Sequence, residues 1–247
     1  MPRFFIEKEA VKDNVAEIVG EDARNISRVL RLGIGDNVIL FDEDGLEYHC
    51  VIRQRNSKRL KVEIIQKVYL QRESSVEIIL GQGLPKLHKM DIIVQKSTEL
   101  GIHELVPFHA HRSMPKLDRE RLIKKVERWR KIALEATKQC GRNIIPHIEY
   151  PIDFKEIIKN EEATDGLKLF LWEGDGTIDL REILQANSDK KRFIVLVGPE
   201  GGFTDKEVQD ANEHGFKTAS MGSRILRSET ASISIVSIIQ YMFGDLH

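Results

Sequence analysis

The chain has 247 residues, of which 31% are charged and 41% hydrophobic, and its formal net charge at pH 7 is −1. This balance is typical of a globular protein with a packed core, and it excludes a disordered or membrane-embedded chain. No apolar run approaches the roughly 20 residues that span a bilayer, and the N-terminal residues lack the apolar stretch of a signal peptide, so we expect a cytoplasmic protein.

Residues 1–72 are predicted to form a small β-barrel domain. Its predicted strands, each rich in β-branched residues, are 37–42, 46–54 and 59–68. Asp44–Gly45 between the first two indicates a hairpin turn. A short helix over 22–32 is expected before them, ending at Gly33 because glycine favours the conformation that closes a helix.

After residue 72 the predicted strands alternate with helices, which indicates a parallel sheet with crossover helices and a domain boundary near Glu73. The predicted strands are 76–82, 103–108, 166–172, 192–198 and 217–221. The predicted helices are 88–100, 118–140 and 230–243. Trp129 shares one face of the helix over 118–140 with other apolar residues, so we expect it in the core.

The strand over 192–198 leads into the glycine-rich turn GPEGG and then directly into a helix. Thr204 and Glu207 have the spacing of a capping box, which predicts where that helix begins. Ligands of open α/β sheets bind at the carboxyl ends of strands, where this turn lies. The turn is therefore a predicted ligand site, although a tight turn without a ligand is the alternative.

The composition of GPEGG restricts the ligand class. Its spacing differs from the G-x-G-x-x-G of dinucleotide sites, and it lacks the Lys-Ser or Lys-Thr pair of a P-loop. The carboxylate of Glu200 would repel a phosphate. A cofactor without phosphate groups therefore fits this turn better than a nucleotide.

A second glycine-containing loop, MGSRILRSETAS, also joins a strand to a helix. Apolar Ile225 and Leu226 lie between Arg224 and Arg227, which is unusual for a solvated turn. This loop is suited to cover an adenine with aliphatic groups and to present a guanidinium to an anion. Its hydroxyl groups have a simpler explanation, since Ser228 or Thr230 is suited to cap the last helix.

Five segments, in order along nearly the whole chain, resemble the RsmE family of 16S ribosomal RNA uridine N3-methyltransferases. They are RNISRVLRLGIGD, KMDIIVQKSTELG, ERWRKIALEATKQCGRNIIP, LVGPEGGFT and MGSRILRSETA. The resemblance implies a PUA-like β-barrel over residues 1–72 and an α/β SPOUT methyltransferase domain over residues 73–247. It also implies a deep C-terminal trefoil knot, a homodimer, and S-adenosylmethionine as the cofactor. The chain departs from the family pattern at Asn25 and His111.

The resemblance assigns the cofactor to the loops of the knot. The cofactor-binding residues implied for this chain are Leu171, Trp172, Leu196, Gly198, Gly201, Gly202, Met221, Gly222, Ile225 and Leu226.

The implied reaction methylates N3 of a uridine, which becomes nucleophilic only after it loses its proton. A cation near the ring oxygens would stabilise the resulting anion, and Arg227 or Arg112 is the candidate. Glu229 is the candidate base; its alternative role is a favourable negative charge in the first turn of the last helix.

The implied RNA partner is 16S rRNA within the 30S subunit, but a net charge near zero does not by itself indicate a nucleic-acid partner. The local distribution is more informative, because eleven basic and only four acidic residues occur between Arg112 and Arg142. The candidate phosphate contacts are Arg3, Arg28, Arg31, Arg112 and Arg142. A non-catalytic RNA-binding or ribosome-assembly factor, and a SPOUT enzyme with another target such as tRNA, remain as alternatives.

No metal site is expected. His109 and His111 lack a nearby third ligand, and the two cysteines, Cys50 and Cys140, are far apart in the sequence. We expect both thiols to be buried.

Overall fold

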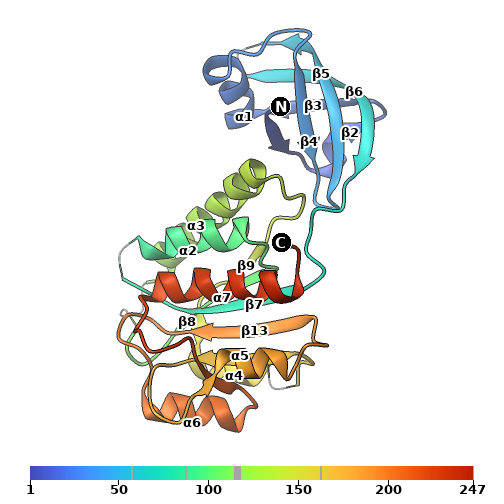
Figure 1. Ribbon diagram of the computed structural model, residues 1–247. Helices are drawn as coiled ribbons and strands as arrows, with labels where there is room; N and C mark the ends of the chain where they lie inside the picture. Colours follow the sequence, from blue (N-terminus) through green and yellow to red (C-terminus); the bar gives the residue numbers. More distant parts are fainter. Residues whose placement is uncertain (57, 87, 114–117, 162, 247) are drawn as a thin grey trace. The chain divides into compact units, whose positions relative to one another are not determined.

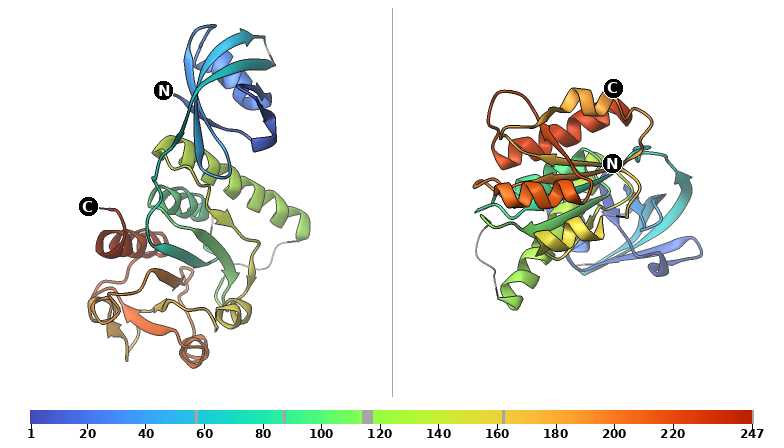
Figure 2. Two further views of the ribbon diagram at one scale, coloured as in Figure 1. Left: turned by 90° about the vertical axis from the view of Figure 1, so that its right-hand side faces the viewer. Right: turned by 90° about the horizontal axis from the view of Figure 1, so that it is seen from below.

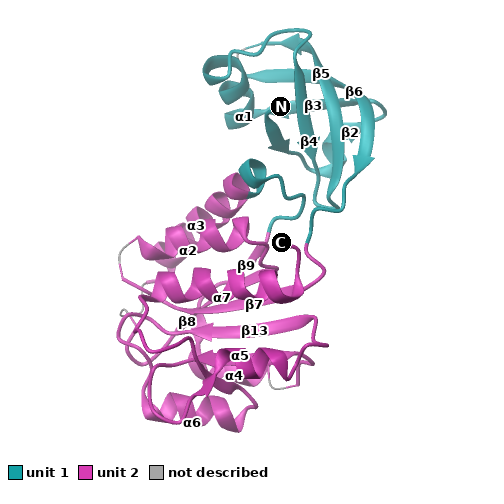
Figure 3. Ribbon diagram, viewed as in Figure 1, with its two compact units in different colours: residues 1–73, 137–145 teal, residues 74–136, 146–247 magenta. Residues whose placement is uncertain are grey.

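The computed structural model describes residues 1–56, 58–86, 88–113, 118–161 and 163–246. The chain forms two compact units (Figure 3). Unit 1 comprises residues 1–73 and 137–145, and unit 2 comprises residues 74–136 and 146–247. The last turn of helix α3 (Arg119–Cys140) and the loop that follows it therefore belong to the N-terminal unit.

Unit 1 is a curved six-stranded sheet with the order β1-β4-β5-β6-β3-β2, in which β1 pairs with β4 in parallel and all other pairs are antiparallel. Its strands are β1 (Arg3–Phe5), β2 (Val11–Lys12), β3 (Val15–Val19), β4 (Asn37–Phe41), β5 (Leu46–Arg55) and β6 (Arg59–Tyr69). The last three confirm the predicted strands, and Gly45 takes a φ of 79° in the hairpin turn between β4 and β5. Alternate residues of these strands, such as Leu40, Ile52 and Leu60, fill one apolar core.

The predicted helix over 22–32 is shorter than expected. Helix α1 (Gly20–Arg24) continues into a π-helical turn, η2 (Asn25–Val29), and stops there. The left-handed conformation that we assigned to Gly33 is adopted by Arg31, with a φ of 55°. Gly33 as the end of this helix is therefore wrong, because the wider π turn ends the helix earlier.

Unit 2 contains an eight-stranded sheet in which every pair is parallel, as predicted. The order is β10-β8-β7-β13-β11-β14-β12, with β9 paired to β8. The strands are β7 (Glu77–Gly83), β8 (Glu104–His109), β9 (His147–Ile148), β10 (Ile152–Asp153), β11 (Leu167–Leu171), β12 (Ile178–Asp179), β13 (Arg192–Val197) and β14 (Lys217–Ser220). The five longer strands were predicted; the two-residue strands are too short for a period to be seen.

Helices cover both faces of this sheet. Helices α2 (Lys89–Glu99) and α7 (Ser228–Phe243) lie side by side on one face (Figures 1 and 2). Helices α4 (Phe154–Asn160), α5 (Leu180–Gln185) and α6 (Asp205–Glu213) lie on the other, and α4 and α5 were not predicted. The apolar face of α3 is confirmed, since Trp129 is buried.

A cluster of phenylalanines fixes the start of α6. The ring of Phe203 packs on Phe170, with 4.1 Å between the ring centroids, and also contacts the rings of Phe108 and Phe154. Burying a phenylalanine side chain contributes about 1.5–3 kcal/mol. Phe203 therefore anchors the C-terminal end of the GPEGG turn to the core, and the predicted capping box of Thr204 and Glu207 follows it directly.

The two cysteines differ in environment. Cys50 is buried, and burial raises the pKa of its thiol to about 12. Cys140 is exposed, so the expectation that both thiols are buried is wrong for this residue, which is the last of helix α3. None of the helices in the described ranges is long and apolar enough to cross a membrane.

Candidate active site

A cavity of about 240 Å³ opens at the carboxyl ends of β11, β13 and β14. The two glycine-bearing connections, after β13 and after β14, both line it. Its lining residues are Leu171, Trp172, Glu173, Val197, Gly198, Pro199, Glu200, Gly202, Phe203, Ala219, Ser220, Met221, Gly222, Arg224, Ile225, Leu226, Arg227, Ser228 and Ala231. Segments far apart in the sequence therefore enclose one space.

Most of the predicted cofactor residues line this cavity, namely Leu171, Trp172, Gly198, Gly202, Met221, Gly222, Ile225 and Leu226. Leu196 does not, because successive strand residues point to opposite faces and its side chain is fully buried in the core of the sheet. Gly201 does not either. It lies against Arg112, whose Cβ would be only 2.8 Å from a Cβ at position 201.

A buried amide joins the two connections. Gln82, fully buried at the end of β7, donates from Nε2 to the Ser228 hydroxyl at 2.9 Å, and its Oε1 accepts from the Ser232 hydroxyl. The Ser228 hydroxyl in turn donates to the carbonyl of Gly198 at 2.6 Å. Ser228 therefore ties helix α7 to the GPEGG turn; it does not cap α7, whose N-cap residue is Arg227.

The approach of β7 to this turn is too close for a side chain. A Cβ on Gly83 would lie 2.6 Å from Cδ of Pro199 and 2.8 Å from its backbone nitrogen. Both atoms belong to a rigid ring or to the backbone, so the turn would have to move. The cavity therefore keeps this shape only if position 83 is a glycine.

Charged groups make a second connection. The ammonium of Lys89, the first residue of α2, lies 3.1 Å from Oε1 of Glu200 and 3.2 Å from Oε2 of Glu229. The backbone N–H of Lys86 donates to both oxygens of Glu200. The hydrogen bond to Glu200 raises the pKa of Lys89. Burial alone would raise the pKa of Glu200, but the backbone N–H groups of Glu200 and Lys86, together with Lys89, hold it below its ordinary value.

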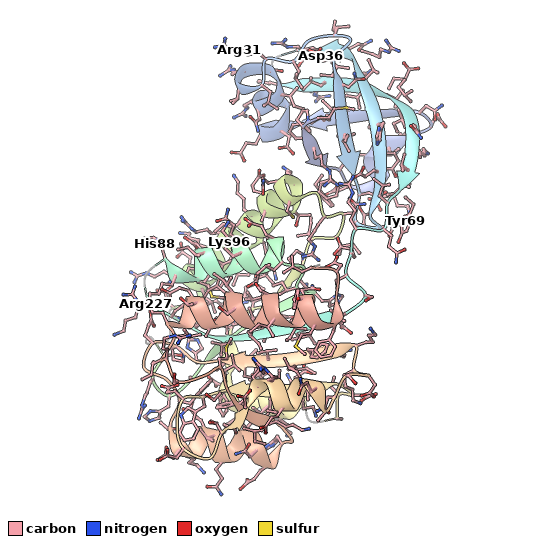
Figure 4. All side chains as sticks on the ribbon, viewed as in Figure 1. Arg31, Asp36, Tyr69, His88, Lys96 and Arg227 are labelled. Carbon is pink, nitrogen blue, oxygen red and sulfur yellow. The ribbon has the colours of Figure 1, made fainter. Side chains whose placement is uncertain are left out.

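The three predicted catalytic residues differ in position. Arg227 lines the cavity, is exposed, and has neither an ion pair nor a hydrogen bond from its guanidinium to any residue that the structure describes. Figure 4 shows it at the start of α7, near the start of α2 where His88 lies. Glu229 does not line the cavity and pairs with Lys89. Arg112 is also outside it and donates to the carbonyls of Gly201 and Phe203 at 3.0 and 3.2 Å.

The predicted RNA contacts of unit 1 fall into two groups. Arg28 and Arg31 are exposed in and just after η2. Arg3 and Arg142 have side chains that are only 8% exposed, and they pair with Glu47 and Glu73, each at 2.6 Å. A buried carboxylate such as that of Glu47 requires a counter-ion. The guanidinium groups of Arg3 and Arg142 are therefore engaged by carboxylates of the same unit, and their assignment as phosphate contacts stays a prediction.

The basic run between Arg112 and Arg142 is partly neutralised. Its ion pairs with acidic residues of unit 2 include, among the described residues, Arg121–Asp118, Lys124–Glu120 and Arg128–Asp91. Lys116, counted in this run, lies outside the described residues. The surface is less basic than its sequence indicates.

Three groups suited to bind a metal come together away from the cavity. The ligand atoms of Glu104, His147 and Glu149 lie within 4.8 Å of one another around β8 and β9. They were not predicted, since the sequence analysis considered only His109 and His111. None of the three lines the cavity.

Comparison with known proteins identifies the family. Residues 72–240 match the RNA methyltransferase domain, and residues 20–65 match the RNA methyltransferase PUA domain. The chain is 34% identical over 249 aligned positions to ribosomal RNA small subunit methyltransferase E of Bacillus subtilis, covering 98% of this chain and 96% of that protein. The chain belongs to the ribosomal RNA small subunit methyltransferase E family.

Solved structures agree with this membership. A putative methyltransferase from Legionella pneumophila with bound S-adenosylmethionine has a TM-score of 0.90 and 33% identity, covering 99% of this chain and 98% of that one. Ribosomal RNA small subunit methyltransferase E from Neisseria gonorrhoeae, bound to the same molecule, has a TM-score of 0.90 and 29% identity over the whole of both chains. The predicted fold class, a PUA-like barrel followed by an α/β SPOUT domain, is confirmed, and the trefoil knot stays a prediction.

Sequence reasoning about this family member missed Gln82, Lys89 and Glu173. Gln82 is the one polar residue late in an apolar strand, which is a weak signal that it has a partner. Lys89 begins a predicted helix, but its two carboxylate partners lie far along the chain, so no spacing in the sequence reveals the contact.

We predict that Gln82→Leu destabilises unit 2 by about 1–3 kcal/mol, because it removes the donor and acceptor that join β7, the GPEGG turn and α7 in a buried setting. Urea unfolding measures this change. Gln95→Leu, at an exposed position of α2, is the matched control and should change the free energy of unfolding by less than about 0.5 kcal/mol. Equal effects of the two substitutions would contradict the role of the network.

Proposed function

We propose that this protein transfers a methyl group from S-adenosylmethionine to N3 of a uridine in 16S ribosomal RNA. The observation that carries the proposal is that both glycine-bearing connections line one cavity, which is also lined by Arg227, a side chain without an ion pair to any described residue. The Bacillus subtilis relative is named a methyltransferase of small-subunit ribosomal RNA, and two similar structures hold S-adenosylmethionine.

The lining of the cavity fits this cofactor. Glu173 and Glu200 contribute two carboxylates, which favour a ligand with positive charge and disfavour one with phosphates. Met221, Ile225 and Leu226 offer aliphatic contacts to an aromatic base. S-adenosylmethionine carries a sulfonium, an ammonium and an adenine but no phosphate. The residues proposed to hold it are Leu171, Trp172, Gly198, Gly202, Met221, Gly222, Ile225 and Leu226.

The protein's own part in the reaction is to position the base and stabilise its charge. When bound, S-adenosylmethionine supplies an electrophilic methyl group on sulfur. N3 of uridine attacks the methyl carbon only after its proton has passed to water; the negative charge on the deprotonated base spreads to the ring oxygens, and the sulfur leaves as a neutral thioether. Arg227 is proposed to stabilise that charge, because its guanidinium is at the cavity and is not engaged elsewhere in the described chain. Arg112 and Glu229 are proposed to act indirectly, through the GPEGG turn and through Lys89.

Residues 1–72 are proposed to bind the ribosomal RNA. Arg28 and Arg31 are exposed and close together in sequence, and they would contact phosphates, which contribute affinity and orientation more than sequence choice. A target within the 30S subunit, a cytoplasmic location and the absence of a metal stay predictions.

A homodimer is proposed as the active form. Large apolar side chains are exposed on neighbouring helices: Tyr241 and Met242 on α7 are 71% and 40% exposed, and Ile92 on α2 is 48% exposed. We expect analytical ultracentrifugation of the purified protein to give a molar mass twice that of the chain. A monomer at micromolar concentration would contradict the dimer.

The enzyme assignment is tested by methyl transfer. Purified protein, labelled S-adenosylmethionine and 30S subunits lacking the modification are expected to yield 3-methyluridine in 16S rRNA, detected by mass spectrometry of nucleotides. Calorimetry with the cofactor provides an independent readout. Binding of rRNA without binding of S-adenosylmethionine would identify a non-catalytic factor, and modification of tRNA alone would reject the target.

We predict that Arg227→Ala lowers kcat on the order of 100-fold, because it removes the cation that stabilises the uridine anion. Arg181→Ala, at an exposed position of α5, is the control and should leave kcat unchanged. Steady-state rates with 30S subunits measure both. An unchanged kcat for Arg227→Ala would remove this residue from the mechanism.

We predict that the double substitution Arg28→Ala/Arg31→Ala weakens binding of rRNA and lowers the slope of log K against log salt by about one to two. Fluorescence anisotropy at several salt concentrations measures the slope. The control is Arg53→Ala in the same unit, since Arg53 already pairs with Glu63. A slope that is the same in all three proteins would mean that RNA is bound by another surface.

A further inference from the structure

Lys89 links two carboxylates, that of Glu200 in the GPEGG turn and that of Glu229 in the first turn of α7. Its side chain is 25% exposed, and those of Glu200 and Glu229 are 26% and 18% exposed. One ammonium thus serves two partly buried carboxylates that come from different segments. Ion pairs with this degree of burial are screened less by solvent than pairs on the open surface.

The same two carboxylates are neighbours of Arg227 in the chain or in the cavity. Glu229 is two residues from Arg227, and Glu200 lines the cavity that Arg227 also lines. An arginine side chain is long and pairs readily with carboxylates. Within the described chain neither carboxylate forms an ion pair with Arg227, and both lie at ion-pair distance from the ammonium of Lys89.

We propose that Lys89 is a positioning residue for methyl transfer: by binding Glu200 and Glu229, it keeps the guanidinium of Arg227 free to face the target base. This inference rests on the proposed function, since it assumes that Arg227 stabilises the uridine anion. It adds a task for α2, a helix that contributes no residue to the lining of the cavity.

The backbone contacts of Glu200 explain why Lys89, Glu200 and Glu229 keep one geometry. The carboxylate accepts from the N–H of Lys86 with both oxygens at 3.1 Å, so it is fixed toward the segment before α2. Glu229 has no such backbone contact among the hydrogen bonds of the described chain, so its position depends on the ammonium of Lys89. Without the ammonium, the freed carboxylate of Glu229 would have Arg227 as a cation close in the chain, and a pair between them would withdraw the guanidinium from the substrate.

The test compares Lys89→Met with the double variant Lys89→Met/Glu229→Gln in the full-length protein. For Lys89→Met we expect kcat to fall about ten- to hundredfold, which corresponds to the loss of a charge-assisted contact. The dissociation constant of S-adenosylmethionine, measured by calorimetry, should change less than about threefold. In the double variant kcat should return to within about threefold of Glu229→Gln alone, because no carboxylate at position 229 then competes for Arg227.

Two controls separate this role from general stabilisation. Lys89→Arg retains a cation and should keep most of kcat. Lys96→Met removes a lysine of the same helix that pairs with Glu99 at 2.9 Å, and it should leave kcat unchanged; both Lys96 and Arg227 are marked in Figure 4.

The outcomes distinguish the two proposals. A wild-type protein that neither binds S-adenosylmethionine nor methylates 30S subunits would overturn the proposed function and this inference with it. Active wild type with equally active Lys89→Met would overturn only the role of Lys89. Parallel losses of kcat, cofactor affinity and melting temperature in Lys89→Met, without recovery in the double variant, would also overturn it, because they indicate a purely structural lysine.

Discussion

The shape of the cavity depends on one buried amide. Gln82 is fully buried at the end of β7, and its amide donates to the hydroxyl of Ser228 in α7. The Ser228 hydroxyl in turn donates to the carbonyl of Gly198. Three chain segments that are remote in sequence are thereby joined by neutral hydrogen bonds. A neutral network suits this place, since a buried charge would require a partner of its own, and the space near the carboxyl ends of the strands is needed for a ligand.

Charged side chains surround the neutral hydrogen-bond network of Gln82. Lys89 binds Glu200 and Glu229 on the side of α2, and Arg112 binds the carbonyls of Gly201 and Phe203 from outside the turn. These contacts engage Lys89 and Arg112, neither of which lines the cavity. Arg227 lines the cavity without an ion pair to any described residue, as does Arg224, and is then available for an anionic substrate. The arrangement gives the loops rigidity without using the group that the proposed chemistry needs.

The sequence predicted the elements whose signal is local. The five longer strands of unit 2, helix α3 with buried Trp129, and the capping box of Thr204 and Glu207 follow from periodicity and from residues a few positions apart. It failed where an outcome depends on distant partners or on small changes in backbone geometry. The sequence favours Gly33 as the end of a helix, yet a π turn ends that helix earlier and Arg31 takes the positive φ.

The candidate site follows the same division. Eight of the ten predicted cofactor residues line the cavity, whereas Leu196 points to the opposite face of its strand. Arg3 and Arg142 looked like surface cations, but buried Glu47 and partly buried Glu73 bind them. Neither carboxylate is near its arginine in sequence, so composition alone does not distinguish a phosphate contact from a structural ion pair.

The first unit is not a continuous piece of chain. Asn143, contributed by residues 137–145, is 2% exposed; its amide donates to the carbonyls of Gly45 and Leu70, and its backbone N–H donates to Glu73. A fragment cut after residue 73 would leave these acceptors and the carboxylate of Glu73 without their donors. The barrel therefore cannot be exchanged between proteins as a simple N-terminal cassette, and a graft has to carry the end of helix α3 with it.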